Sequence, residues 1–456
     1  MTTQNSDFSS EQEDIIQSIK EKEGIPGVAA AIVKDGEIVA ASGFGYRNKD
    51  AQLPMTIHTV SPLCSLTKSF TGVAVMQLVE SGKIWLDEPV VSYLPNFRVA
   101  DTDASRKMTP RTFLCHKSGM GRTGHQARMF TEPEPYKDRG DLVSQLAEVQ
   151  LQTSPNAAFS YCNEGYVTLG HLVETVSGIP LEDYFQSQIF DTVGMKRTYP
   201  RFAQWQAEAD RSHGYVKNEG DYEETQLPEN YNIYLSTGGI CSTAYDYANY
   251  LIATMDYANS PLLSSGSLDA MHTVSMPYGD TGWGYGFGWA IAWNGGRKIV
   301  SHGGGLSGIA TYALMVPAEQ FGVVALTNLS GDDARKIAEH LANNVLGMPL
   351  VQPTPEDSLA FNTGYSFLGA DALAHYAGSY THVYQDEETE ITVAIEEGNL
   401  TVQYAGEEAI PYIGIGTDLF MSQRTGSWGT IVHFVRDAEE NVNSLLQGGI
   451  LYQRCG

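Results

Sequence analysis

A serine and a lysine three residues apart stand at the head of an apolar segment. The residues from Ser61 to Phe70 read SPLCSLTKSF, and an apolar run continues to Val79. Residues three apart lie on one face of a helix, so the Ser65 hydroxyl and the Lys68 amine can meet. A helix start offers free N–H groups to an oxyanion, and an amine withdrawn from water can serve as a neutral base. We predict a nucleophile and its base here; a capping serine with a snorkelling lysine is the simpler alternative.

A tyrosine and an asparagine form the next candidate pair, in the segment FSYCN from Phe159 to Asn163. A tyrosine whose phenolate is stabilised by a nearby cation can shuttle a proton, which is the role we predict for Tyr161. The amide of Asn163 can orient both a lysine and a substrate. Taken alone, the segment fits better a loop tyrosine followed by an asparagine that caps a helix from Tyr166 to Val176.

A histidine and three glycines open the third candidate segment, SHGGGLSG from Ser301 to Gly308. A glycine-rich edge admits a substrate backbone and can present a backbone N–H as an oxyanion donor. His302 would assist proton transfer; a tight bulged turn with a buried histidine is the alternative. The segment also matches the Gly-x-Gly-x-x-Gly pattern of dinucleotide-binding proteins. The residues after it predict a strand instead of a helix, which excludes that interpretation.

The sequence contains no pattern that indicates a cofactor or a metal. Its 11 histidines include no His-Glu-x-x-His and no cluster with cysteine or aspartate. The Gly-x-Ser-x-Gly elbow of α/β-hydrolases is also missing from the sequence, which argues against that class of serine enzyme. We therefore expect no cofactor and no metal site.

The composition indicates a folded, acidic protein. The chain has 456 residues, of which 42% are hydrophobic, and a formal net charge of −26. This charge argues against a nucleic-acid surface or an anionic membrane, and no segment approaches the roughly 18 apolar residues that span a bilayer. The N-terminus lacks the features of a signal peptide, and the five cysteines are scattered. We expect reduced thiols, a cytoplasmic location and a small-molecule or peptide substrate; the oligomeric state is left open.

The first part of the chain predicts helices mixed with strands. Residues 10–22 read as a helix that a capping box at Ser10 opens. A hairpin should follow, with strands at 28–33 and 38–41 around an Asp-Gly turn. A later aromatic stretch, residues 285–293, reads as one strand.

The last part of the chain predicts a second domain. A periodic helix from Asp332 to Leu346 would close a first domain of residues 1–350. Residues 351–369 contain a proline-rich stretch and would form a linker. Short alternating runs then predict a small antiparallel sheet or barrel in residues 370–456.

Taken in order, Ser-x-x-Lys, Tyr-x-Asn and His-x-Gly resemble the serine β-lactamase and penicillin-binding-protein superfamily, in its class C-like or esterase branch. Each motif is weak alone, but the three are highly specific together. The stretch LCHKSGM from Leu114 to Met120 is similar to a further motif of these proteins. The resemblance covers about residues 10–347. It implies an α/β (α+β) fold, in which an antiparallel sheet is flanked by helices and joined by a helical subdomain. The tail around residues 376–380 resembles the lipocalin-like barrel appended to some members.

The resemblance implies a role for each candidate residue. Ser65 would be the acylated nucleophile, Lys68 its base and Tyr161 the second proton carrier. Asn163 would position the substrate and Lys68. The backbone N–H groups of Ser65 and Gly305 would form the oxyanion hole.

His302 stands where β-lactamases have the lysine of Lys-Thr-Gly, which points towards the D-peptidase, esterase and acyltransferase members. We predict a serine hydrolase or acyltransferase that acts on a peptide-like amide or ester through a Ser65 acyl-enzyme. With an amine or alcohol as acceptor, it would be a peptide cyclase or acyltransferase of natural-product biosynthesis. The alternative of another class is a non-catalytic relative that binds a ligand.

Overall fold

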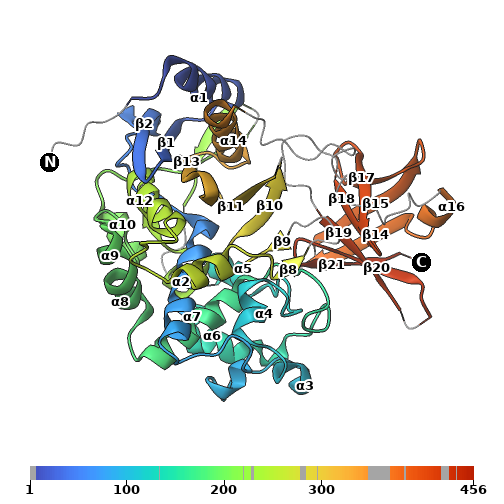
Figure 1. Ribbon diagram of the computed structural model, residues 1–456. Helices are drawn as coiled ribbons and strands as arrows, with labels where there is room; N and C mark the ends of the chain where they lie inside the picture. Colours follow the sequence, from blue (N-terminus) through green and yellow to red (C-terminus); the bar gives the residue numbers. More distant parts are fainter. Residues whose placement is uncertain are drawn as a thin grey trace.

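The computed structural model describes residues 7–132, 134–218, 220–226, 231–277, 284–294, 296–347, 370–384, 387–422, 431–437 and 439–455. They form a mixed α/β part, in which helices flank a large antiparallel sheet, and a closed β-barrel at the C-terminal end (Figure 1). This architecture confirms the predicted fold class. The predicted linker lies outside the described residues, so the domain boundaries stay a prediction.

The large sheet has nine strands in the order β3-β2-β1-β13-β12-β11-β10-β9-β8. Strand β1, the third in this order, is buried on both sides: alternate residues from Val28 to Val33 point into two different hydrophobic clusters. A sheet with two buried faces must be covered by helices on both. The strands are β1 (Gly27–Lys34), β2 (Glu37–Asn48), β3 (Leu53–Pro54), β8 (Met276–Pro277), β9 (Gly284–Tyr285), β10 (Ala290–Asn294), β11 (Arg297–Leu306), β12 (Ile309–Val316) and β13 (Phe321–Thr327).

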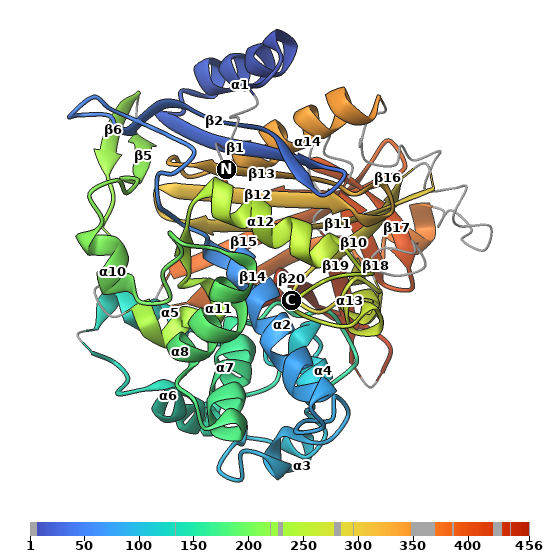
Figure 2. The same cartoon turned by 60° about the vertical axis from the view of Figure 1, so that its left-hand side comes forward.

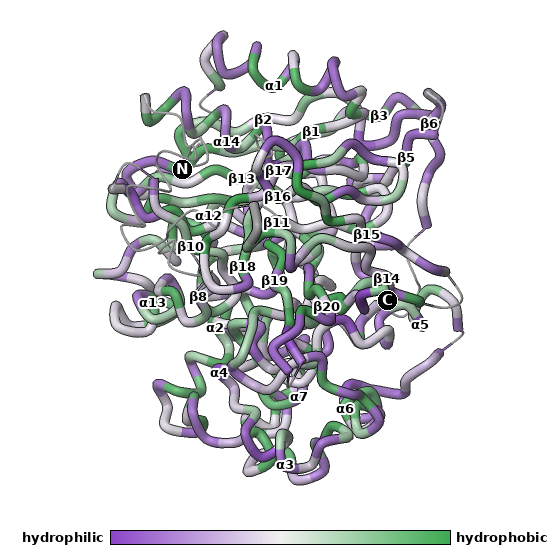
Figure 3. The backbone as a smooth tube through the Cα atoms, turned by 90° about the vertical axis from the view of Figure 1, so that its right-hand side faces the viewer, coloured by the Kyte–Doolittle hydropathy of each residue, from purple (hydrophilic) through white to green (hydrophobic). Residues whose placement is uncertain are grey.

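Helices cover both faces of this sheet (Figure 2). On one face lie α1 (Ser10–Glu23) and α14 (Asp333–Leu346), which bury apolar residues such as Ile16 and Leu341 against the strands. In Figure 3, α1 alternates between hydrophobic and hydrophilic residues, as a surface helix does. The other face carries α12 (Ala244–Met255) and α2 (Thr67–Glu80).

The helical region around α2 supplies most residues of the site. α2 is buried nearly all round, as its apolar sequence predicts. The α-helices that contact α2 include α7 (Asn163–Ser177), α8 (Leu181–Phe185), α11 (Leu235–Gly238) and α13 (Ser265–Met271). The other helices of this part of the chain are α3 (Thr102–Ser105), α4 (Pro110–Leu114), α5 (His125–Thr131), α6 (Arg139–Gln145), α9 (Asp191–Val193) and α10 (Phe202–Ala207).

Two local predictions are wrong in detail. The capping box of α1 is formed by Ser9 and Gln12, one residue earlier than predicted, because Ser10 already belongs to the helix. The expected strand 285–293 is two strands, β9 and β10, separated by a loop. Gly288 in this loop has φ +79°, and a Cβ there would lie 2.6 Å from the Lys68 carbonyl oxygen. The loop therefore passes too close to α2 to continue as a strand.

The C-terminal barrel is closed by eight antiparallel strands. Tyr376 and Tyr380 lie in its core, and the Tyr376 hydroxyl donates to Asp418 Oδ1 at 2.8 Å. Ile415 and Met421 of the barrel pack on Ala292 of β10, so the two parts are in contact. The strands are β14 (Gly378–Tyr384), β15 (Glu387–Glu396), β16 (Asn399–Tyr404), β17 (Ile410–Gly416), β18 (Leu419–Ser422), β19 (Ile431–Arg436), β20 (Val442–Gln447) and β21 (Ile450–Arg454).

The described residues include no disulfide bond and no candidate membrane-spanning helix. All five cysteines carry free thiols, four of them buried and one, Cys455, exposed. Among the described residues, no helix combines the length and the apolar character that crossing a bilayer requires.

Candidate active site

Ser65 lies in a short 3-10 turn, η1 (Cys64–Leu66), that runs directly into α2. The preceding residue, Cys64, has φ +52°, a strained conformation for a non-glycine residue. This turn packs against β11 at Gly304, where a Cβ would lie 2.7 Å from the Leu63 carbonyl oxygen. Gly304 therefore lets the turn that carries Ser65 approach β11 closely, and the sequence did not indicate this role.

Lys68 occupies the first turn of α2 and is completely buried. Its Nζ lies 3.0 Å from Ser65 Oγ and 2.9 Å from the carbonyl oxygen of Thr237. Burial, with a contribution from the charge of Arg122, lowers the pKa of Lys68 to about 7. The Thr237 carbonyl can only accept, so the Lys68 amine donates a hydrogen bond to it. A neutral amine then still has its lone pair, which can accept the proton of Ser65.

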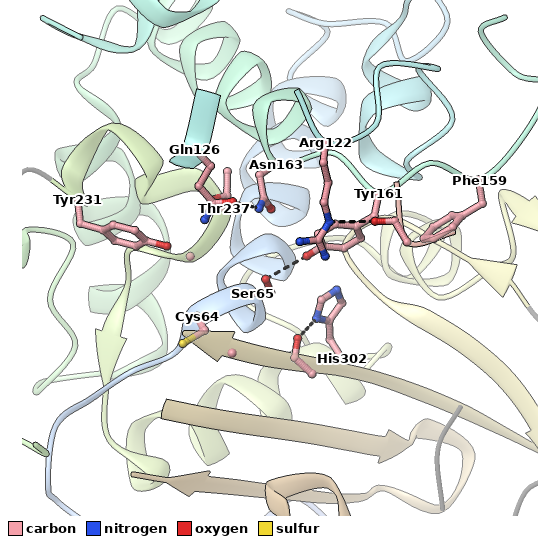
Figure 4. A pocket seen from close by; sticks show the side chains of 14 residues that line it. Cys64, Ser65, Arg122, Gln126, Phe159, Tyr161, Asn163, Tyr231, Thr237 and His302 are labelled. Carbon is pink, nitrogen blue, oxygen red and sulfur yellow. Dashed lines mark hydrogen bonds between the residues drawn. The ribbon is translucent and has the colours of Figure 1, made fainter. Parts of the chain in front are cut away.

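Tyr161 points its hydroxyl at the same serine (Figure 4). Its hydroxyl donates to Ser65 Oγ at 3.0 Å. Burial raises the pKa of Tyr161 well above its usual value, so the group is a neutral phenol. The ring packs against His116 in a tilted arrangement, with centroids 4.1 Å apart, and His116 Nδ1 accepts the N–H of Cys162. The Leu114–Met120 motif therefore holds the tyrosine loop in place.

Asn163 is the first residue of α7 and lines the cleft. It does not cap the helix, because Cys162 does so by accepting the N–H of Gly165. Its Nδ2 donates to the side chain of Gln126, and its buried Oδ1 has no partner among the described residues. That oxygen is available to a substrate N–H. Within the described chain, no hydrogen bond joins Asn163 to Lys68.

His302 lies on β11 with both ring nitrogens engaged. Nδ1 lies 2.6 Å from the Gly303 carbonyl oxygen, and Nε2 lies 2.7 Å from the Tyr285 hydroxyl. The carbonyl can only accept, so Nδ1 carries the hydrogen and Nε2 accepts from Tyr285. Burial, aided by the charge of Lys68, lowers the pKa of His302 to about 3. A neutral ring with two partners suits a positioning group, and the part of His302 in proton transfer stays a prediction.

The variant His302→Gln distinguishes positioning from proton transfer through the pH dependence of acylation. We expect the low-pH limb to stay near pH 7, because it belongs to Lys68 and not to a histidine with a pKa of about 3. The rate should fall by less than the roughly hundredfold or more that loss of a general acid or base costs. The measurement is kcat/KM between pH 5 and 9. Disappearance of the limb in His302→Gln would return the histidine to proton transfer.

The predicted residues enclose a cleft of about 520 Å³. Ser65, Tyr161, Asn163, His302 and Gly305 line it, and the amine of Lys68 lies beneath Ser65. β10 pairs with β11 only as far as Ser301, so the described strands leave the edge of residues 302–306 open beside Ser65. This open edge supports the predicted use of the Gly305 N–H as an oxyanion donor.

The cleft also contains residues that the sequence did not single out. Arg122, Gln126 and Tyr231 line it, together with Gly448 from the C-terminal barrel. The carbonyl of Thr237 holds Lys68. A backbone carbonyl cannot be recognised from residue types, and Gly448 is distant from the other cleft residues along the chain. Neither could therefore be predicted from the sequence.

Comparison with known proteins decides the family. The model of the family described as Beta-lactamase matches residues 13–346, which is well over half of the chain. The chain belongs to the beta-lactamase family. This confirms the predicted resemblance to the serine β-lactamase and penicillin-binding-protein superfamily.

Individual relatives of this beta-lactamase-like chain are distant. Protein flp of Staphylococcus aureus strain MW2 is 24% identical over 337 residues, 73% of this chain and 65% of that protein. The D-aminopeptidase of Brucella anthropi is 28% identical over 331 residues, 71% of this chain and 60% of that protein. The chain thus spans less than two thirds of either relative. The octameric penicillin-binding protein homologue from Pyrococcus abyssi is 25% identical with a TM-score of 0.68, covering 97% of this chain and 99% of that one.

Proposed function

We propose that the chain is an acyl-enzyme hydrolase that cleaves peptide-like amides or esters at Ser65. One observation carries the proposal: the Lys68 amine and the Tyr161 hydroxyl both lie 3.0 Å from Ser65 Oγ. A base and a proton donor on one serine are what a covalent acyl transfer requires. A ligand-binding relative would have no chemical need for this arrangement.

Acylation begins with the neutral amine of Lys68. It takes the proton of Ser65 as Oγ attacks the carbonyl carbon, and the resulting ammonium keeps its hydrogen bond to Thr237. The negative charge moves to the carbonyl oxygen, where the N–H groups of Ser65 and Gly305 would receive it. The unpartnered Oδ1 of Asn163 would accept an N–H of the substrate and fix its orientation.

The leaving group departs with a proton from the Tyr161 hydroxyl. Tyr161 in turn recovers a proton directly from the Lys68 ammonium, whose Nζ lies 4.9 Å from the centroid of its ring. The neutral state of Tyr161 suits it to this donation. In the second half-reaction a water attacks the ester carbon while its proton passes to the same pair, Lys68 and Tyr161. Ser65 Oγ then leaves the acyl group and regains a proton from that pair.

The acceptor and the substrate class need a direct assay. The likeness to a D-aminopeptidase supports amides of D-residues as first substrates, with water as the acceptor. The experiment is a screen of D- and L-aminoacyl amides and p-nitrophenyl esters, with and without added amines. We expect hydrolysis and an intact-mass shift that peptide mapping places on Ser65. No turnover and no adduct with a fluorophosphonate would refute an enzymatic role, and product only with amines would make the chain an acyltransferase or cyclase.

A further inference from the structure

A guanidinium group stands in the cleft without an acidic partner. Arg122 is an exposed residue in the loop between α4 and α5, and its side chain extends to the region of Tyr161 (Figure 4). None of the described acidic side chains forms an ion pair with Arg122. The residues described as lining the cleft include no aspartate or glutamate, and Arg122 is the only permanent cation among them.

The tip of a barrel hairpin holds this arginine in place. Gly448 and Gly449 connect β20 to β21. The backbone N–H of Arg122 donates to the Gly449 carbonyl oxygen at 2.7 Å, and its Nε donates to the Gly448 carbonyl oxygen at 3.0 Å. Gln152 Nε2 also donates to Gly449, at 2.9 Å. With Nε occupied, the two terminal nitrogens of the guanidinium remain for a ligand.

The same hairpin tip is packed against the catalytic tyrosine. Gly449 has φ +84°, and a Cβ there would lie 2.2 Å from the carbonyl oxygen of Tyr161. No side chain fits between the two segments. The barrel, Arg122 and Tyr161 are therefore one packed unit, so the barrel sets the position of the guanidinium relative to Ser65.

The charge of Arg122 acts on the groups that react. It contributes to the lowered pKa of Lys68, after burial, and it opposes the rise that burial causes in the pKa of Tyr161. Both effects require the guanidinium to be near these groups. A substrate held at Ser65 would thus place a neighbouring anionic group within reach of Arg122.

We propose that Arg122 binds a free carboxylate of the substrate. The inference rests on the proposed function and names its substrate class: amides or esters that carry a carboxylate close to the scissile bond. The two terminal nitrogens of a guanidinium match the two oxygens of a carboxylate in a bidentate pair. A single cation in this cleft balances one negative charge, which favours a carboxylate over a phosphate dianion.

Two matched pairs of substrates test the inference. In each pair a free acid is compared with its carboxamide, on the leaving side in one pair and on the acyl side in the other. We expect the wild-type chain to prefer the acid in one pair by about tenfold or more in kcat/KM, mainly through KM. Arg122→Gln should remove that preference. Equal rates for acid and carboxamide in both wild-type pairs, or an unchanged preference in Arg122→Gln, would overturn the proposal.

Arg128→Gln is the matched control for this experiment. Arg128 lies on α5 and forms an ion pair with Glu132. It is not among the residues that line the cleft. It should keep the preference for the acid, and a loss there would point to a general charge effect and count against Arg122. Adduct formation at Ser65 is measured first on the wild-type chain. Its absence would refute the proposed function, whereas an adduct with no acid preference would refute the role of Arg122 alone.

Discussion

Replacement of Ser65 by alanine is expected to abolish acylation. Among the described residues, Ser65 Oγ is the only hydroxyl oxygen that both Lys68 and Tyr161 contact, and the variant removes it. We expect kcat/KM to fall by roughly 10⁴-fold or more, as loss of a catalytic serine does in other serine hydrolases. The adduct with a fluorophosphonate should also disappear from the intact-mass spectrum.

Ser307→Ala is the control for this variant. Ser307 is exposed in the turn between β11 and β12 and is not among the residues that line the cleft. Its loss should leave activity and labelling close to those of the unmodified chain, as surface substitutions usually do. A label that persists in Ser65→Ala, or that maps to Ser118 or Ser307, would contradict the mechanism.

Replacement of Lys68 by arginine should be about as damaging as replacement by methionine. A guanidinium stays charged at every working pH and offers no lone pair, and methionine keeps much of the volume without a base. We expect both variants to lose roughly 10³-fold or more in the rate of acylation. Lys117→Arg is the control, because its amine contacts Ser275 and not the nucleophile. Substantial activity in Lys68→Arg would make the lysine a mere electrostatic partner.

The pH dependence of the unmodified chain tests the same base. Only the neutral amine of Lys68 accepts the proton of Ser65, and its pKa is about 7. The acylation rate should therefore be level above about pH 8 and fall about tenfold for each pH unit well below 7. The limb is measured from single-turnover rates of adduct formation. A base with the ordinary lysine pKa of 10.5 would instead give a rate that still rises at pH 9.

The pairing of Ser65 with Lys68 was open to prediction because local geometry determines their relation. Ser65 and Lys68 lie three residues apart at the start of one helix, and helical spacing alone brings their side chains to one face. The buried, apolar α2 follows from its composition. The alternating runs after residue 370 likewise predict strands, since an antiparallel sheet with one buried face imposes a period of two.

What tertiary structure decided are the partners that come from distant segments. The lone pair of Lys68 is directed by a carbonyl at residue 237. The ring of His302 is neutral because it is buried close to Lys68, and Gly303 and Tyr285 fix its tautomer. Arg122 faces the cleft because the carbonyls of Gly448 and Gly449 bind it. Protonation states depend on burial and hydrogen-bond partners, which residue types and spacing do not encode. The sequence therefore determined which groups could react, and packing between remote segments decided which of them carry a proton.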